Sequence, residues 1–250
     1  MKIDQNIFKY LKGDLFTNSL RIDLDRTRYE SLTREEIITQ IIKGKDVIHI
    51  GCSDHIPVIK QKIAVNRWLH KLISENSSSC LGIDIDRESI DYVRNELGFE
   101  NVICGNILTD NLEVITSKKW DYVVFGEIIE HIGNPVEFLK TFRERFGKNI
   151  SRFIISVPDI YNKKNLANML SFREEINSDH RFWFTPYTIS KILVDSGYFP
   201  ESITFGNLIP LSKKELALRK LRKMTGMKVA YPFYYFSSII AIGEIQNRIS

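Results

Sequence analysis

A short apolar run that ends in a glycine constrains the fold of this chain more than any other stretch. Residues 45–54 read Lys-Asp-Val-Ile-His-Ile-Gly-Cys-Ser-Asp. The β-branched residues predict a buried strand over residues 47–50, and the glycine with its small polar neighbours predicts a tight loop over residues 51–54. In open α/β sheets, ligands lie beyond the carboxyl ends of the strands, where such loops leave backbone N–H groups free. Any strand-to-loop turn has this pattern, so the rest of the chain must decide its role.

Strand-like and helix-like segments alternate after this loop. Apolar runs predict further strands at residues 81–86, 102–104, 120–125 and 153–157. Apolar residues at helical spacing predict helices at residues 58–74, 88–97 and 186–196, and another that follows the fourth strand and ends at Phe142. Mostly apolar strands that alternate with helices are typical of a parallel sheet covered on both faces. We therefore predict an α/β, Rossmann-like fold with a mostly parallel sheet.

The first 44 residues are predicted to form a helical cap ahead of this sheet. Apolar residues recur at helical spacing up to Ile42. Thr33-Arg34-Glu35-Glu36 gives a plausible cap at the start of the second helix, and Gly44 is suited to end it. We expect residues 1–44 to form this cap and residues 45–250 to form one domain, with a basic insertion at about residues 206–236.

The composition is that of an ordinary globular protein. Of the 250 residues, 43% are apolar and 26% are charged. No apolar run approaches the roughly 18 residues that span a bilayer, and the first residues lack the apolar core of a signal peptide. Three cysteines without paired spacing argue against a disulfide framework or a zinc site. We expect a cytoplasmic protein with reduced thiols, in which Cys52 behaves as a small apolar residue.

Polar residues stand where the second and third predicted strands end. Asp84 follows the glycine loop at a spacing that suits it to accept hydrogen bonds from ribose hydroxyls, as in dinucleotide sites. Asp86 falls where the next helix begins and is better suited to cap that helix. Asn106 offers an acceptor and a donor for an adenine edge. Ile85 and Ile107 flank these residues and could sandwich a flat ring.

The glycine loop differs from the fingerprint of nicotinamide-dependent dehydrogenases. That fingerprint is G-x-G-x-x-G, whereas residues 51–56 read Gly-Cys-Ser-Asp-His-Ile and lack two of the three glycines. An NAD-dependent Rossmann oxidoreductase is therefore the weaker alternative. An adenosine-containing ligand without a pyrophosphate stays open.

Taken in order, these motifs resemble those of class I S-adenosylmethionine-dependent methyltransferases. The resemblance is carried by Val47-Ile48-His49-Ile50-Gly51-Cys52, Gly82-Ile83-Asp84-Ile85, Gly105-Asn106 and the block Trp120-Asp121-Tyr122-Val123-Val124-Phe125-Gly126-Glu127-Ile128-Ile129-Glu130-His131-Ile132-Gly133-Asn134-Pro135. The last block is similar to a branch that includes the ubiquinone-biosynthesis O-methyltransferases and many sugar or surface-glycan methyltransferases. The resemblance covers roughly residues 45–205.

The resemblance implies a seven-stranded sheet with a last, antiparallel strand at residues 239–244. It also implies roles for the residues that match the motifs. The backbone of Gly51, Cys52 and Ser53 would hold the methionine moiety of S-adenosylmethionine, Asp84 the ribose, Asn106 the adenine amine, and Glu127 would lie beside the methionine end.

The chain departs from the family pattern at the first loop, which usually reads acid-x-G-x-G-x-G. His49 stands in place of the acid, and Ser53 and Asp54-His55 replace the later glycines. Asn106 replaces the commoner aspartate, and its side-chain carbonyl can still accept from an amine. A loop with fewer glycines has less conformational freedom to wrap a cofactor.

Two histidines are candidates for the catalytic base. Methyl transfer from a sulfonium is an in-line displacement, so catalysis rests on positioning and, where needed, on removal of a proton from the acceptor. His131 follows Glu130 after the fourth predicted strand. His180 lies in a segment, residues 179–185, that is similar to the "DH-x-x-x-F-T/S" segment of this branch. For each histidine, a structural hydrogen bond within the fold is the alternative.

Glu127, Glu130 and His131 are spaced so that all three would share one helical face. The ubiquinone O-methyltransferases use a similar E-x-x-E-H set for a divalent cation, and carboxylates with one imidazole suit such an ion. A polar patch beside the cofactor is the alternative interpretation. We adopt that interpretation and expect no metal.

A basic segment and a group of aromatic residues follow the core motifs. The aromatic residues could wall an acceptor pocket or pack a small lid; they are Tyr161, Phe172, Phe182, Trp183, Phe184 and Tyr187. Residues 211–228 carry a net charge of +6, which leaves −2 for the remainder of a chain whose total is +4. The helix expected at residues 212–228 could contact an anionic membrane surface, receive an anionic substrate, or be a solvated face. No nucleic-acid module is present, so we expect no nucleic-acid partner.

These observations predict an S-adenosylmethionine-dependent methyltransferase. We expect O-methylation of a small-molecule or glycan-like acceptor. The alternative outside enzymes is a cofactor-binding pseudo-methyltransferase that acts as a protein-interaction module.

Overall fold

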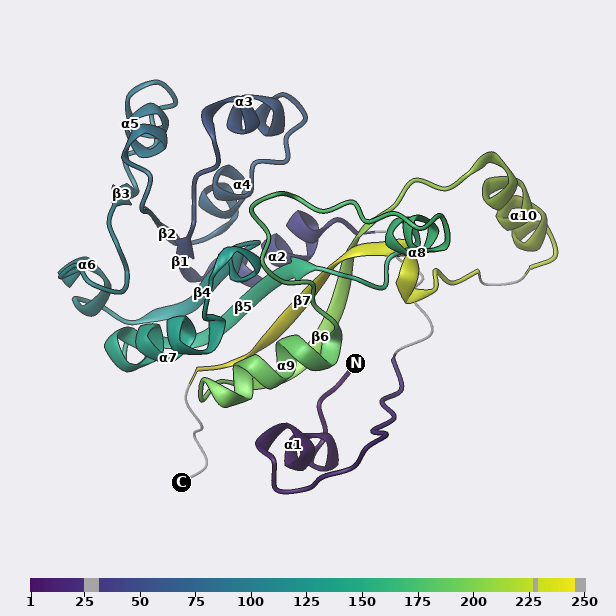
Figure 1. The fold of residues 1–250 in the computed structure, drawn as a ribbon. Helices are drawn as coiled ribbons and strands as arrows, with labels where there is room; N and C mark the ends of the chain where they lie inside the picture. The colour runs from purple at the N-terminus through teal and green to yellow at the C-terminus, as the bar shows by residue number, and fades with distance from the viewer. Residues whose placement is uncertain (25–31, 227–228, 246–250) are drawn as a thin grey trace.

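A seven-stranded, mostly parallel sheet forms the centre of the fold. The computed structural model describes residues 1–24, 32–226 and 229–245. Figure 1 shows the sheet, whose strand order is β3-β2-β1-β4-β5-β7-β6. Its strands are Asp46–Ile50 (β1), Ser79–Asp84 (β2), Val102–Cys104 (β3), Trp120–Gly126 (β4), Ile150–Pro158 (β5), Phe199–Leu208 (β6) and Phe236–Glu244 (β7). β7 runs antiparallel to β5 and β6, whereas β1 to β5 pair in parallel. The predicted α/β, Rossmann-like fold with its antiparallel last strand is confirmed.

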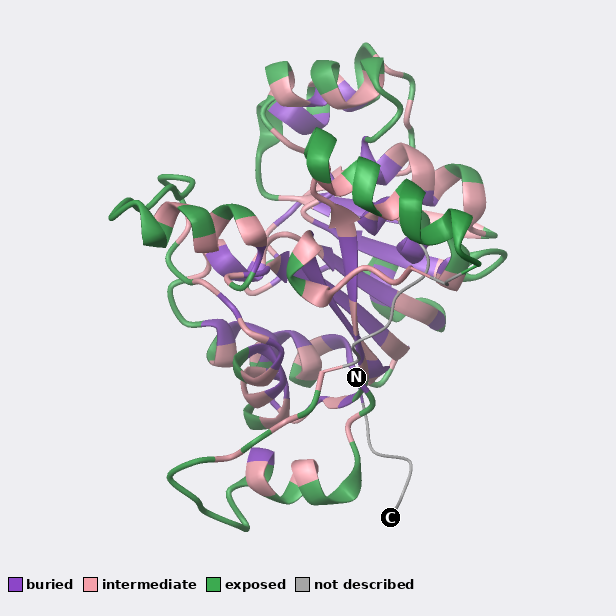
Figure 2. Cartoon of the chain, turned by 90° about the vertical axis from the view of Figure 1, so that its right-hand side faces the viewer, coloured by how far each residue is buried: buried purple, intermediate pink, exposed green. Residues whose placement is uncertain are grey.

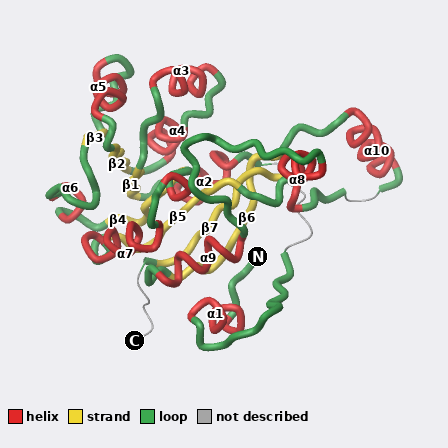
Figure 3. Tube along the Cα trace, in the orientation of Figure 1, coloured by secondary structure: helices red, strands yellow, loops and turns green. Residues whose placement is uncertain are grey.

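Helices flank this sheet, as Figure 3 shows. Among the described residues the α-helices are Gln5–Lys12 (α1), Arg34–Ile42 (α2), Ile56–Ala64 (α3), Leu69–Asn76 (α4), Arg87–Asn95 (α5), Glu113–Thr116 (α6), Pro135–Phe146 (α7), Lys163–Leu170 (α8), Pro186–Asp195 (α9) and Lys213–Met224 (α10). Two short 3-10 helices are Ile129–His131 (η1) and Phe233–Tyr235 (η2). None of these helices has the length and hydrophobicity needed to cross a bilayer.

Alternate residues of the central strands pack into two cores on opposite faces of the sheet. From β1, Val47 packs with α2 and α4, whereas Ile48 and Ile50 pack with α7 and α9. Successive side chains of a strand point to opposite faces, so an uninterrupted apolar strand requires cover on both sides. Figure 2 shows the strands as the buried centre of the molecule. Polar groups that contact a ligand must therefore lie at the ends of the strands.

The first 44 residues divide between two parts of the molecule. α2 packs on the sheet through Ile38 and Ile42, and its capping box at Thr33 is formed as predicted. α1 packs against α9, where the Lys191 ammonium donates to the carbonyl oxygen of Leu11. Figure 1 shows this separation, with α1 near α9 and α2 beside the strands. α2 therefore belongs to the layer of helices that covers the sheet.

Several predicted elements have different bounds in the structure. The helix expected at residues 58–74 is two helices, α3 and α4, because the chain turns between them and Asn66 adopts a left-handed conformation with φ 52°. β2 ends at Asp84, and Asp86 caps α5 as predicted. After β4 the chain forms η1, and α7 begins only at Pro135, a residue suited to the first helical position.

Gly243 tests how tightly β6 and β7 pack. A Cβ at this position would lie 2.0 Å from the carbonyl oxygen of Phe199 and 2.8 Å from Cα of Pro200, both backbone atoms. We expect Gly243→Ala to lower the free energy of unfolding by about 3 kcal/mol, because one strand must move. The matched control is Gly98→Ala, whose Cβ meets nothing within 4 Å and whose φ of +74° carries only local strain of about 1 kcal/mol. Urea denaturation checks both, and equal losses would contradict this packing.

Candidate active site

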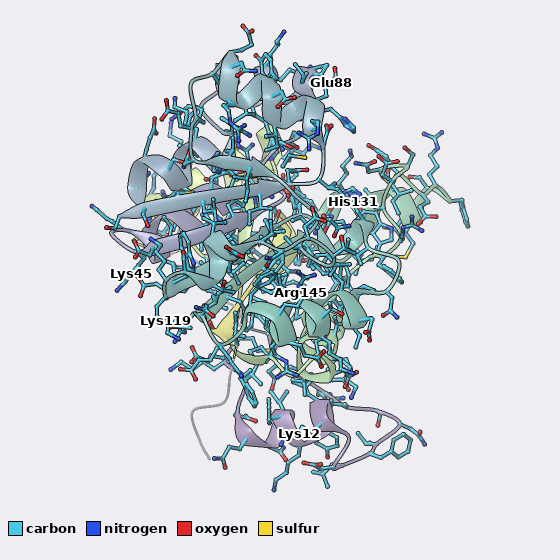
Figure 4. The ribbon with its side chains drawn as sticks, turned by 90° about the vertical axis from the view of Figure 1, so that its left-hand side faces the viewer. Lys12, Lys45, Glu88, Lys119, His131 and Arg145 are labelled. Atoms are coloured by element: carbon cyan, nitrogen blue, oxygen red, sulfur yellow. The ribbon has the colours of Figure 1, made fainter. Side chains whose placement is uncertain are left out.

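Two adjoining cavities lie at the carboxyl ends of the parallel strands. The apolar cavity, of about 460 Å³, is bounded by the ends of β1, β2 and β3 and by α7. The polar cavity, of about 590 Å³, extends over the ends of β1 and β4 to α2 and to the loop before α9. Gly51, Asp84, Ile85 and Ile128 line both cavities. In Figure 4, His131 lies at the opposite end of the sheet from Lys45 and Lys119, which precede β1 and β4.

The loop after β1 separates the two cavities and is tightly held. Gly51 has φ +67°, and a Cβ there would lie 2.4 Å from Cδ1 of Ile128, so the position favours glycine. The N–H groups of Gly51 and Cys52 donate to the carbonyl oxygen of Ile83, at 2.8 and 3.4 Å. The N–H of Ser53 donates to Asp84 at 3.0 Å. The expectation that this loop leaves its N–H groups free is therefore wrong for these three residues, and carbonyl oxygens are what they can offer a ligand.

Asp84 organises the loops around both cavities. One carboxylate oxygen accepts from the N–H of Ser53, and the other accepts from the N–H of Asp86 at 3.0 Å. The carboxylate thus joins the loop after β1 to the start of α5. A carboxylate has about four acceptor positions, so Asp84 can still accept hydrogen bonds from a ligand in either cavity.

The apolar cavity contains the other residues expected around an adenine. Asn106, Ile107 and Ile85 all line it. Ile107 is buried at 6% exposure, whereas the side chain of Ile85 projects into the opening at 69%. The side-chain carbonyl of Asn106 accepts from the N–H of Leu108 at 2.9 Å, so one of its two acceptor positions is already used.

Glu127 is not on a helix, and the expectation that it shares a helical face with Glu130 and His131 is wrong. It follows the last residue of β4 and adopts a left-handed conformation with φ 59°. Its carboxylate lies 2.7 Å from the guanidinium of Arg34 and accepts from the hydroxyl of Ser238 at 3.3 Å. The turn at Glu127 thus directs this carboxylate toward α2, into the polar cavity.

The buried guanidinium of Arg34 is a site residue that the sequence analysis missed. Its side chain is 4% exposed and also lies 3.0 Å from Glu35. Burial lowers the pKa of Arg34, but the carboxylates of Glu127 and Glu35 outweigh it and raise that pKa. A signal was present, because Arg34 precedes Ile38 and Ile42 by four and eight residues and so lies on the apolar stripe of its helix.

The two candidate histidines lie together over the polar cavity. His131 ends η1, and His180 lies in the loop between α8 and α9; their ring centroids are 4.7 Å apart, edge to face. The backbone N–H of Arg181 donates to the carbonyl oxygen of Glu130 at 2.8 Å, and its guanidinium donates to that of His131 at 3.0 Å. These bonds hold the two segments together. Partial burial and the neighbouring His131 lower the pKa of His180.

A buried carboxyl group lies beneath the two histidines. Glu130 is fully buried, and neither carboxyl oxygen has a hydrogen-bond partner within the described residues. Burial, and then the nearby Glu127, raise the pKa of Glu130 to about 8. One ligand atom from each of Glu130, His131 and His180 lies within 4.8 Å of the others, so this group could hold a divalent cation. His180 thus takes the place that the sequence analysis gave to Glu127 in this set.

A second histidine pair lies in the core beside the polar cavity. Nδ1 of His49 is 3.3 Å from Nδ1 of His70, and both rings are buried. Burial lowers the pKa of both, that of His70 to about 4, so each ring is neutral at pH 7. His49 was expected only as the replacement of an acid, and its contact with His70 on α4 was not predicted.

The aromatic residues expected near the acceptor do not all lie in one place. Tyr161, Phe172 and Trp183 line a third cavity of about 490 Å³ beside α8, which we call the α8 cavity. Phe184 is instead buried in the main core, where it packs with residues of α9. Within the described residues, the α8 cavity is mainly apolar, and it adjoins the loop that carries His180.

Comparison with known proteins agrees with this geometry. A family model described as a methyltransferase domain matches residues 25–202, which is more than half of the chain. A search of curated proteins found no match.

Three solved structures illustrate the likeness in fold. The small RNA methyltransferase HEN1 is 17% identical with a TM-score of 0.55, over 94% of this chain and 28% of that one. A putative methyltransferase from Bacillus halodurans C-125 is 12% identical with a TM-score of 0.51, over 86% and 99%. A SAM-dependent methyltransferase from Archaeoglobus fulgidus is 16% identical with a TM-score of 0.48, over 84% and 94%.

The family match over residues 25–202 agrees with the strand order and with the position of the cavities. These findings favour a methyltransferase over the dehydrogenase alternative. The chain belongs to the methyltransferase-domain family and is a class I S-adenosylmethionine-dependent methyltransferase.

Proposed function

We propose that this enzyme methylates a hydroxyl group of a small-molecule or glycan-like acceptor, with His180 as the base. The observation that carries the proposal is the His131–His180 pair above the polar cavity, next to a cavity suited to adenosine. Bound S-adenosylmethionine supplies an electrophilic methyl group on a sulfonium. The residues of the chain must then bind the cofactor, orient the acceptor and remove its proton.

The apolar cavity fits the adenosine half of the cofactor. Its volume of about 460 Å³ lies in the range of small-ligand sites. Asp84 would accept from the ribose hydroxyls, Asn106 would meet the adenine edge, and Ile85 with Ile107 would cover the ring. The backbone of Gly51, Cys52 and Ser53 would border the methionine half through its carbonyl oxygens.

The methionine half would extend toward the Arg34–Glu127 pair. An amino acid end carries one ammonium and one carboxylate, and this pair offers a charge of each sign in one place. Arg34 is buried and fixed by Glu35, so it is a preorganised partner for a carboxylate. Glu127 would receive the ammonium.

His180 has the properties of a general base. Its lowered pKa keeps most of the imidazole neutral at pH 7, so a ring nitrogen can accept a proton from a hydroxyl. His131, edge-on to it, would fix the orientation of the ring. A general base of this kind contributes typically 10²–10⁴-fold to the rate.

The charges of the polar cavity support a neutral acceptor over a nucleic acid. Even without the protonated Glu130, acidic residues outnumber basic ones in its lining: Asp54, Asp84, Asp86, Glu127 and Asp179 face Arg34 and Lys62. Lys62 is already paired with Asp54, and Arg34, which lies against Glu127, would be occupied by the carboxylate of the cofactor. A phosphate backbone requires unpaired cations, so RNA is the weaker candidate despite the likeness in fold to HEN1.

The proposal is tested by methyl transfer from labelled S-adenosylmethionine to a panel of hydroxylated small molecules and glycans, with RNA as the comparison. We expect label in a hydroxyl-bearing acceptor of the first two classes. Transfer to RNA alone, or to nitrogen rather than oxygen, would overturn the proposed acceptor class.

Asp84→Ala is expected to weaken S-adenosylmethionine binding by about tenfold to a hundredfold, because a charged hydrogen-bond partner is lost. Since Asp84 also holds Ser53 and Asp86, Asp84→Asn, which keeps one oxygen, should lose less. The matched control is Asp91→Ala, an exposed residue of α5. Calorimetric titration measures all three, and an unchanged affinity of Asp84→Ala would remove Asp84 from the site.

His180→Ala is expected to lower kcat by about 10²–10⁴-fold while the Kd for S-adenosylmethionine changes little. The exposed His55, which also lines the polar cavity, provides the control His55→Ala. Steady-state rates with a hydroxyl acceptor and calorimetry with the cofactor separate the two effects. A fully active His180→Ala would return His180 to a structural role.

Glu130→Gln is expected to change how stability depends on pH. Because the folded-state pKa of Glu130 is raised to about 8, its favourable contribution is complete below the ordinary pKa of 4.5 and is lost as pH rises through 8. Gln does not titrate, so the variant should gain in Tm relative to the wild type between pH 5 and pH 9. Thermal melts with a chelator present measure this, beside the exposed control Glu100→Gln. A difference that stays constant with pH would show that Glu130 is ionised in the folded protein.

A further inference from the structure

The helix α10 lies in the connection between β6 and β7 and is supported on one side only. Figure 1 shows it at the end of the molecule beyond α8, away from the sheet. No residue of α10 is buried, and only Glu215 and Arg219 are partly covered. The N-terminus of the helix is nevertheless capped, because Ser212 and Glu215 form a capping box. The basic segment continues to Lys228, which lies outside the described residues.

Glu215 and Arg219 fix which face of α10 points inward. The carboxylate of Glu215 accepts from the hydroxyl of Tyr235 at 2.6 Å and pairs with Lys163 at 3.2 Å. The guanidinium of Arg219 donates to the carbonyl oxygens of Val229 and Ala230 at 2.8 and 3.1 Å. Residues four apart lie on the same side of a helix, so these contacts attach one face to the protein and leave the other outward.

The outward face of α10 is apolar and flanked by bases. Leu218, Leu221 and Met224 are spaced three apart and are 49%, 60% and 76% exposed. Five exposed bases accompany them: Lys213, Lys214, Lys220, Arg222 and Lys223. Glu215, the helix's acid, faces the protein. A helix with an apolar stripe bordered by lysine and arginine has the pattern of helices that lie in the interface of a membrane.

We propose that the outward face of α10 binds the surface of a lipid bilayer that carries anionic headgroups. Leu218, Leu221 and Met224 would enter the boundary between headgroups and acyl chains. The flanking bases would meet lipid phosphates, which attract lysine and arginine near an anionic surface. The anchors at Glu215 and Arg219 would transmit this attachment to the body of the enzyme.

The chemistry of this face favours a bilayer over the other partners of a basic helix. The phosphates of a nucleic acid would pair with the lysine and arginine side chains of α10, but its leucines and Met224 would stay in water. A solvated face has no need of three exposed apolar side chains in line. An anionic bilayer can bind both the basic and the apolar side chains of α10, because its surface is charged and its interior is apolar.

A second exposed apolar group adjoins α10. Lys163, which pairs with Glu215, begins α8. Leu170, the last residue of α8, and Phe172, two residues later, are 77% and 99% exposed. Figure 2, which views the molecule from this side, shows α10 largely exposed, and α8 has no buried residue. The α8 cavity opens here as well, so attachment through α10 would bring its apolar lining near the lipid surface.

Sedimentation of the full chain with vesicles tests the proposal. Vesicles of phosphatidylcholine mixed with phosphatidylglycerol are compared with vesicles of phosphatidylcholine alone. We expect binding to the mixed vesicles only, weakened by added salt. Leu218→Ser/Leu221→Ser and Lys220→Gln/Lys223→Gln should each reduce the vesicle affinity at least tenfold. Because these side chains are exposed, their variants should keep the wild-type Tm and S-adenosylmethionine affinity.

Matched controls keep the test specific. Lys140→Gln/Lys148→Gln removes two exposed bases from elsewhere on the surface, and Val65→Ser removes an exposed apolar residue; both should bind vesicles as the wild type does. No binding to mixed vesicles, equal binding to both kinds, or unaltered binding by the α10 variants would overturn the proposal. Binding to RNA in place of vesicles would overturn it in favour of a nucleic-acid partner.

Discussion

A parallel sheet that is buried on both faces leaves its strand ends as the place for polar chemistry. The apolar residues of β1, β4 and β5 fill the cores on either side, and the exception in β1, His49, is neutral and paired with His70. The loops at the carboxyl ends must therefore supply the site. Asp84 holds these loops together, since its carboxylate accepts from Ser53 and Asp86. Asp84 lies in the wall that the two cavities share, together with Gly51, Ile85 and Ile128.

The ion pair between Arg34 and Glu127 connects α2 to this site. The side chain of Arg34 is 4% exposed and that of Glu127 is 33% exposed, so removal of the carboxylate would leave a buried charge less compensated. Here the pair holds a left-handed Glu127 against α2, and Glu35 fixes Arg34 from the other side. α2 is thereby part of the candidate site as well as of the layer that covers the sheet.

The sequence predicted what depends on local pattern. Apolar runs located β1 to β5, and the caps at Thr33 and Asp86 were read from residue type and spacing. β7 was expected from the family resemblance, and β6 was not located from the sequence. The turn at Glu127 was missed because a helical spacing of carboxylates looks the same when the chain is not helical. The contact of His131 with His180 could not be foreseen, because it depends on how the loop before α9 folds back onto η1. The types of residue at the strand ends could thus be predicted from the sequence. Their partners could not, because tertiary contacts bring them together.

The central claim is that the cavities at the strand ends bind S-adenosylmethionine. Calorimetric titration of the full chain with S-adenosylmethionine and, separately, with NAD tests it most directly. We expect saturable binding of S-adenosylmethionine at one site per chain and none of NAD, because the loop after β1 lacks the glycines that a pyrophosphate requires. Binding of NAD, or of neither compound, would contradict it.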